Sequence, residues 1–102
     1  MEKKLSEYER KLEKLRLEIN KHDRELLGVL KKRFMIVKKI AKLKAQYKIS
    51  ILQKKRWKSI IEDRVRLGKK LRLDEKFTKK IMHLIHNESI RTQLHIKNKT
   101  RK

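Results

Sequence analysis

Apolar residues recur every three or four positions over the first half of the chain, which is the spacing of one face of an α-helix. The seam runs through Leu5, Tyr8, Leu12, Leu15, Ile19, His22, Leu26 and Val29. It continues through Leu30, Phe34, Val37, Ile40, Ala41 and Leu43. Gly28 is the only weak point, at a cost of roughly 1 kcal/mol relative to alanine. We therefore predict one long helix over about residues 3–46, on the order of 60 Å in length.

A loop and a second helix are expected to follow. The segment KISILQ, at positions 48–53, loses the helical period and is predicted to connect two helices. The second helix is predicted over about residues 54–71. Its apolar face comprises Trp57, Ile60, Ile61, Val65 and Leu67.

A third helix has a clear start signal. Asp74 is a suitable N-cap, and Glu75 places a negative charge in the first turn, where the helix dipole favours it. This helix is predicted over about residues 75–96, with a frayed basic tail over about residues 97–102. Its apolar side comprises Phe77, Ile81, Leu84, Ile85, Thr92 and Ile96. With no proline and only two glycines, the chain is predicted to form one all-α domain over residues 1–102.

The lengths of the three helices predict a homodimer. Two short helices cannot cover the apolar stripe of a helix about twice as long, so part of that stripe needs another chain. We therefore expect an intertwined homodimer in which the long helices form the spine. A plain coiled coil is the simpler alternative for the seam from Leu5 to Val29.

Charge and cysteine content narrow the function classes. Lys and Arg total 33 against 12 Asp and Glu, for a formal net charge of +21. That balance is typical of a nucleic-acid-binding protein, but a lysine-rich solvated surface and a site for a small polyanion remain open. The absence of cysteine excludes a disulfide scaffold and a thiolate metal site. No apolar run is long enough for a membrane span, and MEKKLSEYER is not a signal peptide, so we expect a soluble, cytoplasmic protein.

Two cations interrupt the apolar seam of the long helix. Arg33 and Lys44 stand where the pattern calls for apolar residues. They are eleven residues apart, about three turns, and so project from one face roughly 16 Å apart along the axis. A buried, unpaired cation costs several kcal/mol, so each needs an acidic side chain, an anionic ligand or a route to the surface.

Polar residues also interrupt the third helix. Ser89 and Gln93 are four residues apart and therefore stack on one face of an otherwise apolar pattern. Arg16 lies at the edge of the first seam, and Arg56 opens the second helix. Together with the two seam cations, these side chains suit a compact dianion better than a phosphate backbone, which is bound by exposed surface cations.

Three segments resemble the all-helical, AroQ-class chorismate mutases. The run LRLEINKHDRELLGVLKKRFMIVKKIAKLK matches their first helix, with the pattern L-R-x-x-I-x-x-x-D-x-x-L-L-x-x-L-x-x-R followed eleven residues later by Lys. KRWKSII and IHNESIRTQ match the second and third helices, so the resemblance covers residues 12–96. It implies that the substrate is chorismate and the product prephenate, within the shikimate pathway of aromatic amino acid biosynthesis. Relatives are often fused to other enzymes of that pathway, which makes such an enzyme a candidate partner.

The resemblance also implies roles for the first-helix cations. Arg16 would reach across the dimer and pair with a substrate carboxylate in the partner's site. Arg33 and Lys44 would bind carboxylates within their own chain, and Lys44 would also approach the ether oxygen. Gln93 would donate to that oxygen from the opposite side. These two donors would stabilise the charge that builds up as the C–O bond breaks, and no metal or cofactor is needed for this intramolecular rearrangement.

The remaining implied site residues come from the second and third helices. Arg56 would support the charge cluster, and Ser89 would hydrogen-bond the ring carboxylate. The Gln53 backbone would lie near the ring hydroxyl. The sequence departs from the family at Trp57, where many members have a glutamate that accepts from that hydroxyl, although a subset carries an aromatic residue there. Since tryptophan has only an N–H donor, this contact is lost or inverted.

Other chemistry is weakly supported. His83 and His86 are three residues apart, but no third metal ligand is placed beside them, so packing or surface exposure is favoured. His22, Asp23 and Ser89 do not form a credible hydrolase triad. A basic helical nucleic-acid-binding protein remains the alternative, and it would be recognised by salt-sensitive duplex binding.

Overall fold

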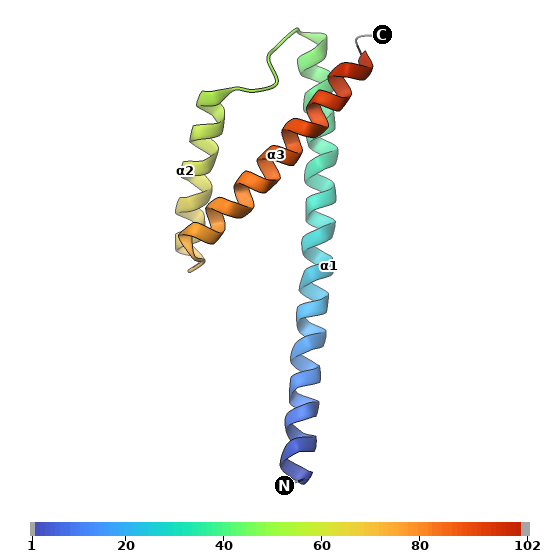
Figure 1. Ribbon diagram of the computed structural model, residues 1–102, viewed down its shortest axis with the longest axis vertical. Coiled ribbons are helices and arrows are strands. Elements are labelled where there is room, and N and C mark those ends of the chain that lie inside the picture. Colours follow the sequence, from blue (N-terminus) through green and yellow to red (C-terminus); the bar gives the residue numbers. More distant parts are fainter. Residues whose placement is uncertain (1, 101–102) are drawn as a thin grey trace. The chain divides into compact units, whose positions relative to one another are not determined.

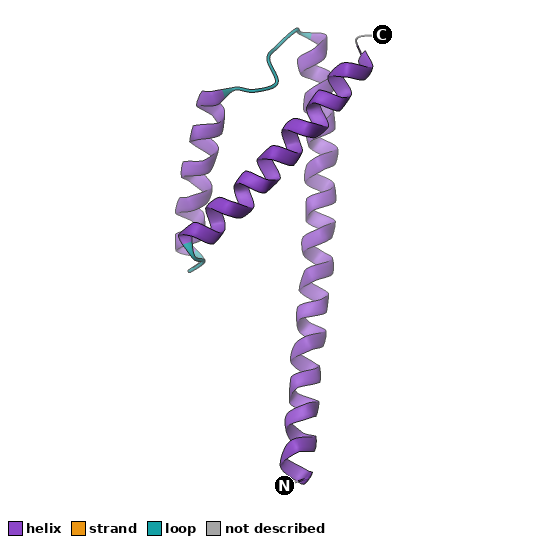
Figure 2. Cartoon of the chain, in the orientation of Figure 1, coloured by secondary structure: helices purple, strands orange, loops and turns teal. Residues whose placement is uncertain are grey.

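The described part of the protein consists of three helices joined by two loops. The computed structural model describes residues 2–100, and over that range it contains α1 (Glu2–Gln46), α2 (Lys54–Lys70) and α3 (Glu75–Thr100), with no strand (Figure 1). Loops join consecutive helices (Figure 2). The all-α prediction is confirmed, and the predicted bounds of the first two helices agree with the structure to within one residue.

The chain divides into two units, one ending at Arg33 and the other beginning at Phe34, and α1 runs through the boundary. The first unit is a helical segment in which most large apolar side chains are exposed, although Leu12 and Leu30 are half-buried. Leu15, Leu26 and Val29 are 57%, 57% and 61% exposed. The part of the predicted seam that lies in the first unit is therefore largely exposed within this chain.

The second unit contains the buried residues of the fold. Val37 and Ala41, on the part of α1 that belongs to this unit, are 7% and 3% exposed. The helices α2 and α3 pack against each other, and Gly68 meets Thr78 there. A Cβ atom on Gly68 would lie 2.9 Å from Thr78 Oγ1, so this glycine allows the two helices to approach closely.

The C-terminal ends of α1 and α2 have the same capping geometry. Lys48 and Arg72 have φ angles of 54° and 61°, in the left-handed region. The amide that follows each of them donates back to a helix carbonyl, from Ile49 to Lys44 at 2.8 Å and from Leu73 to Gly68 at 2.9 Å. This is the pattern of a Schellman cap, which ends a helix by satisfying its last carbonyls.

The start of α3 agrees with the sequence prediction. Asp74 Oδ2 accepts a hydrogen bond from the Phe77 amide at 2.9 Å, so Asp74 is the N-cap. The predicted end was wrong, because α3 continues to Thr100 instead of fraying from Lys97. Residues 101–102 of the predicted tail lie outside the described residues.

The face of α3 that is buried also differs from the prediction. Phe77, Ile81 and Leu84 were expected on its packed side, yet they are 53%, 38% and 68% exposed. The buried positions are instead occupied by small or polar side chains, namely Thr78, Ser89 and Gln93. The hydroxyls of Thr78 and Ser89 donate to the backbone carbonyls four residues earlier, those of Asp74 and Ile85, each at 2.9 Å. Because its hydroxyl is paired, Thr78 can lie at the close contact with Gly68 of α2.

Within residues 2–100, no helix is both long enough and apolar enough to cross a membrane.

Candidate functional site

Lys44 joins three segments of the second unit. Its ammonium donates to Gln93 Oε1 of α3 at 3.1 Å and to the carbonyl of Ile51, in the loop before α2, at 2.7 Å. Gln93 is only 7% exposed, so the contact lies at the interior side of α3. The structure therefore brings together two of the residues that the sequence predicted, from positions 49 residues apart.

The electrostatic state of Lys44 suits an anionic ligand. Burial lowers the pKa of this lysine from its ordinary value of 10.5, because a charged ammonium loses hydration there. Its two acceptors, Gln93 Oε1 and the Ile51 carbonyl, are neutral oxygens that do not cancel its charge. An ammonium has three N–H donors, so one remains beyond these two hydrogen bonds. A carboxylate placed there would restore the favourable environment of the charge.

A cavity of about 630 Å³ lies beside Lys44. Two further cations, Lys48 and Lys97, contribute to its lining, and none of its lining residues is acidic. The rest of the wall is mainly small or apolar, with Ala41, Ala45, Ile49, Ser50 and Ile51. A concave, positively charged site of this size fits a small organic anion.

Ser89 lies on the same side of α3 as Gln93. It is 6% exposed and its hydroxyl donates to the Ile85 carbonyl at 2.9 Å. The four-residue spacing between Ser89 and Gln93 places the two side chains one above the other along the helix. The predicted polar interruption of α3 is therefore buried and faces inward.

The only tryptophan of the chain packs on two histidines of α3. The indole of Trp57 stacks on the His86 ring, with centroids 3.8 Å apart and planes at 19°. The His83 ring meets the same indole edge-on, at 5.1 Å and 65°. His86 was not predicted as a site residue, although its spacing to Ser89 and Gln93, three and seven residues, is that of one helix face. That spacing was the signal available in the sequence.

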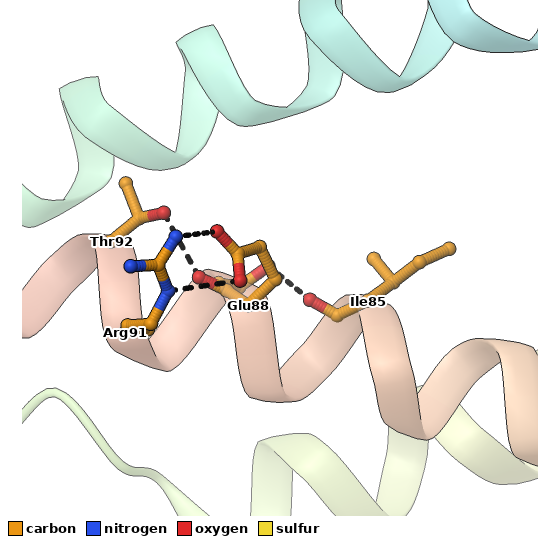
Figure 3. Close-up of polar contacts among 5 residues, drawn as sticks. Ile85, Glu88, Arg91 and Thr92 are labelled. Carbon is orange, nitrogen blue, oxygen red and sulfur yellow. Dashed lines mark hydrogen bonds and ion pairs between the residues drawn. The ribbon is translucent and has the colours of Figure 1, made fainter.

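Glu88 is the acidic residue next to Ser89 in sequence, and it is already paired. Arg91 donates to both of its carboxylate oxygens, with Nε to Oε2 at 3.0 Å (Figure 3). The hydrogen bonds from Arg91 lower the pKa of the Glu88 carboxyl. Thr92 donates its hydroxyl to the Glu88 carbonyl at 2.9 Å, on the same part of the helix. The negative charge of Glu88 is therefore balanced by Arg91.

Four further predicted site residues come from α1 and from the start of α2. Gln53 is the N-cap residue of α2, with an exposed side chain, and its carbonyl accepts from the Trp57 amide at 3.0 Å. Arg56 is exposed in the first turn of α2. Arg16 and Arg33 belong to the first unit, where Arg16 is exposed and Arg33 is half-buried. Their roles at a shared site stay predictions.

The described part of the chain contains no group of three or more His, Cys, Asp or Glu residues that could hold a metal ion. His83 and His86 instead contact Trp57.

A comparison with protein families shows which family the chain belongs to. A family model described as chorismate mutase type II matches residues 15–94, which is most of the sequence. The chain therefore belongs to the chorismate mutase type II family, and the enzymes of this family are isomerases. In a comparison with curated proteins, none matched the chain. The resemblance inferred from the three sequence segments is confirmed at the level of the family.

Proposed function

We propose that this protein rearranges chorismate to prephenate for aromatic amino acid biosynthesis, using its own side chains and no cofactor. The single observation that supports this most strongly is the Lys44–Gln93 contact at 3.1 Å, beside a cavity whose charged lining residues are all cations. Membership of the chorismate mutase type II family supports the same reaction.

The reaction is an intramolecular rearrangement in which a C–O bond breaks while a C–C bond forms. Negative charge develops on the ether oxygen, so donors placed at that atom lower the barrier. The Lys44 ammonium has one N–H beyond its two protein contacts to offer. Because Gln93 Oε1 accepts from Lys44, the amide NH₂ of Gln93 is the end that turns toward a ligand. In this proposal the two residues donate to the same ether oxygen.

The substrate carboxylates require further cations and donors. Arg33 would pair with one carboxylate from the same chain, and Ser89 would hydrogen-bond the other. Arg16 of a second copy would reach the site, and Arg56 would strengthen the positive potential. The Gln53 backbone and Trp57 would border the substrate ring. Holding both carboxylates fixes the compact conformer in which the reacting carbons meet, and this positioning removes much of the entropic barrier.

A second copy of the chain is part of this proposal. Most large apolar side chains of the first unit are more than half exposed, for example Ile19 at 58% and Leu27 at 65%. An apolar stripe of this length is unfavourable in water, and burial against an equivalent stripe stabilises it by roughly 25 cal/mol per Å². The proposed assembly is an intertwined homodimer in which Arg16 crosses into the partner's site.

The test is the loss of chorismate, followed by ultraviolet absorbance in the presence of a metal chelator. The wild-type protein should consume chorismate, and Lys44→Met should lose about 10²-fold or more in kcat, the usual effect of removing a donor from a developing oxyanion. Lys42→Met is the matched control, since Lys42 is exposed on the same helix and should keep full activity. Undiminished turnover by Lys44→Met would contradict the assigned role.

A further inference from the structure

His86, and its stacking on Trp57, have no role in the chemistry described so far, which places only Trp57 beside the substrate ring. We propose that this pair forms a wall of the chorismate site and that the His86 imidazole hydrogen-bonds an oxygen of the bound substrate. This inference rests on the proposed function and adds a substrate-contacting residue to it. The pair stands where α2 and α3 pack together.

Helix geometry places His86 on the site face of α3. At about 100° per residue, His86 lies roughly 20° around the helix from Gln93, and Ser89 lies roughly 40° from it. His83 is roughly 80° away, at the edge of that face. The exposure of the two histidines follows this order, because His86 is half-buried and His83 is exposed. His86 and Gln93 are about 10 Å apart along the axis, a span that one ring with carboxylate arms can bridge.

The stack orients the imidazole for such a contact. Its face lies against the Trp57 indole at 3.8 Å, so α2 closes one side of the ring. Ring nitrogens donate and accept in the plane of the ring, and face-to-face stacking does not engage those directions. A ring held flat also loses little conformational entropy when a ligand binds, which makes it an effective positioning group.

Charge also favours a histidine at this place. A dianionic ligand favours the protonated form of a nearby imidazole, and an aromatic face stabilises that cation by a cation–π contact. Trp57 follows Arg56 directly, so the stack begins one residue after a predicted site cation. The wall would therefore combine an apolar ring surface with a polar edge that can carry positive charge.

The test uses three variants and the fluorescence of Trp57, the only tryptophan of the chain. His86→Leu keeps an apolar contact with the indole but removes both nitrogens, and it should raise the KM for chorismate about three- to tenfold, as expected for one lost hydrogen bond. His86→Gln keeps a donor and an acceptor and should recover most of that loss. His83→Leu is the control, which touches the same indole and should stay within about twofold of wild type. In the wild type, prephenate should change the Trp57 emission with a saturable dependence.

The outcomes separate the two proposals. If the wild type turns over chorismate but His86→Leu has an unchanged KM, or His83→Leu has an equal effect, the inference about His86 is overturned and the proposed function stands. A wild-type enzyme that is active but shows no emission change with prephenate overturns it as well, even if His86→Leu fails to fold. If the wild type neither reacts with chorismate nor responds to prephenate, both proposals fail.

Discussion

The two glycines of the chain predict opposite responses to alanine. Gly68 is buried where α2 meets α3, and a Cβ atom there would lie 2.9 Å from Thr78 Oγ1 and 3.0 Å from Thr78 Cγ2. Gly28 lies inside α1, and a Cβ atom there would meet no other atom within 4 Å. Both glycines are helical and neither has a positive φ, so backbone strain does not distinguish them.

The magnitudes follow from two opposing effects. Replacing glycine by alanine inside a helix stabilises the folded chain by about 1 kcal/mol, because the unfolded backbone loses freedom. Overpacking at a tight contact costs about 1–3 kcal/mol. Thr78 cannot easily move, since its hydroxyl is bonded to the Asp74 carbonyl at 2.9 Å. We therefore expect Gly28→Ala to raise the free energy of unfolding by about 1 kcal/mol and Gly68→Ala to lower it by up to about 2 kcal/mol.

The assay is thermal and urea unfolding followed by circular dichroism at a fixed protein concentration. For a chain of this size, 1 kcal/mol corresponds to a shift of about 4–8 °C in Tm. The double variant Gly68→Ala with Thr78→Ala should be destabilised by less than the sum of the two single changes, because it removes both atoms of the clash. Strict additivity, or a Gly68→Ala protein as stable as Gly28→Ala, would refute the close contact.

Two further predictions concern the charged residues. The lowered pKa of Lys44 means that the unfolded chain binds this proton more tightly than the folded chain does, so the free energy of unfolding should rise with pH between that lowered pKa and 10.5. This rise should be missing in Lys44→Met, and an identical pH dependence of denaturant unfolding in both proteins would contradict the burial of the charge. Arg16→Ala and Gln93→Ala should each be weakly active alone and should recover activity when mixed, because a mixed dimer contains one site without either change. A mixture that stays inactive after subunit exchange has been verified would contradict sites shared between two copies.

Local sequence signals determined the helices. The apolar period predicted α1 and α2 to within a residue, because each helix forms from contacts among neighbours in the chain. Asp74 was identified as the cap of α3 for the same reason, since its carboxylate bonds an amide three residues later. The late end of α3 was missed, because a run of polar and basic residues carries no stop signal such as glycine or proline.

The candidate site was predictable only in part. Lys44 and Gln93 could be chosen because each is a polar residue inside an apolar helical pattern, and such exceptions need partners. The partners themselves could not be predicted. Lys44 contacts Gln93, 49 residues away, and the Ile51 carbonyl, and both contacts depend on how the loop and α3 return to the end of α1. For His86 the sequence favoured packing or surface exposure, because no third metal ligand is placed beside it and His83. Its stacking on Trp57 could not be predicted, since Trp57 lies on a different helix.

The sequence by itself therefore determined which segments are helical, where α3 begins and which polar residues break the apolar faces. Only the tertiary structure decided which face of α3 is buried, and it selected Thr78, Ser89 and Gln93 over the larger Phe77, Ile81 and Leu84. The physical reason is that helical periodicity depends on neighbours in the chain, whereas burial depends on how closely another helix can approach. At the contact between α2 and α3, Gly68 and Thr78, whose hydroxyl is satisfied, allow that approach.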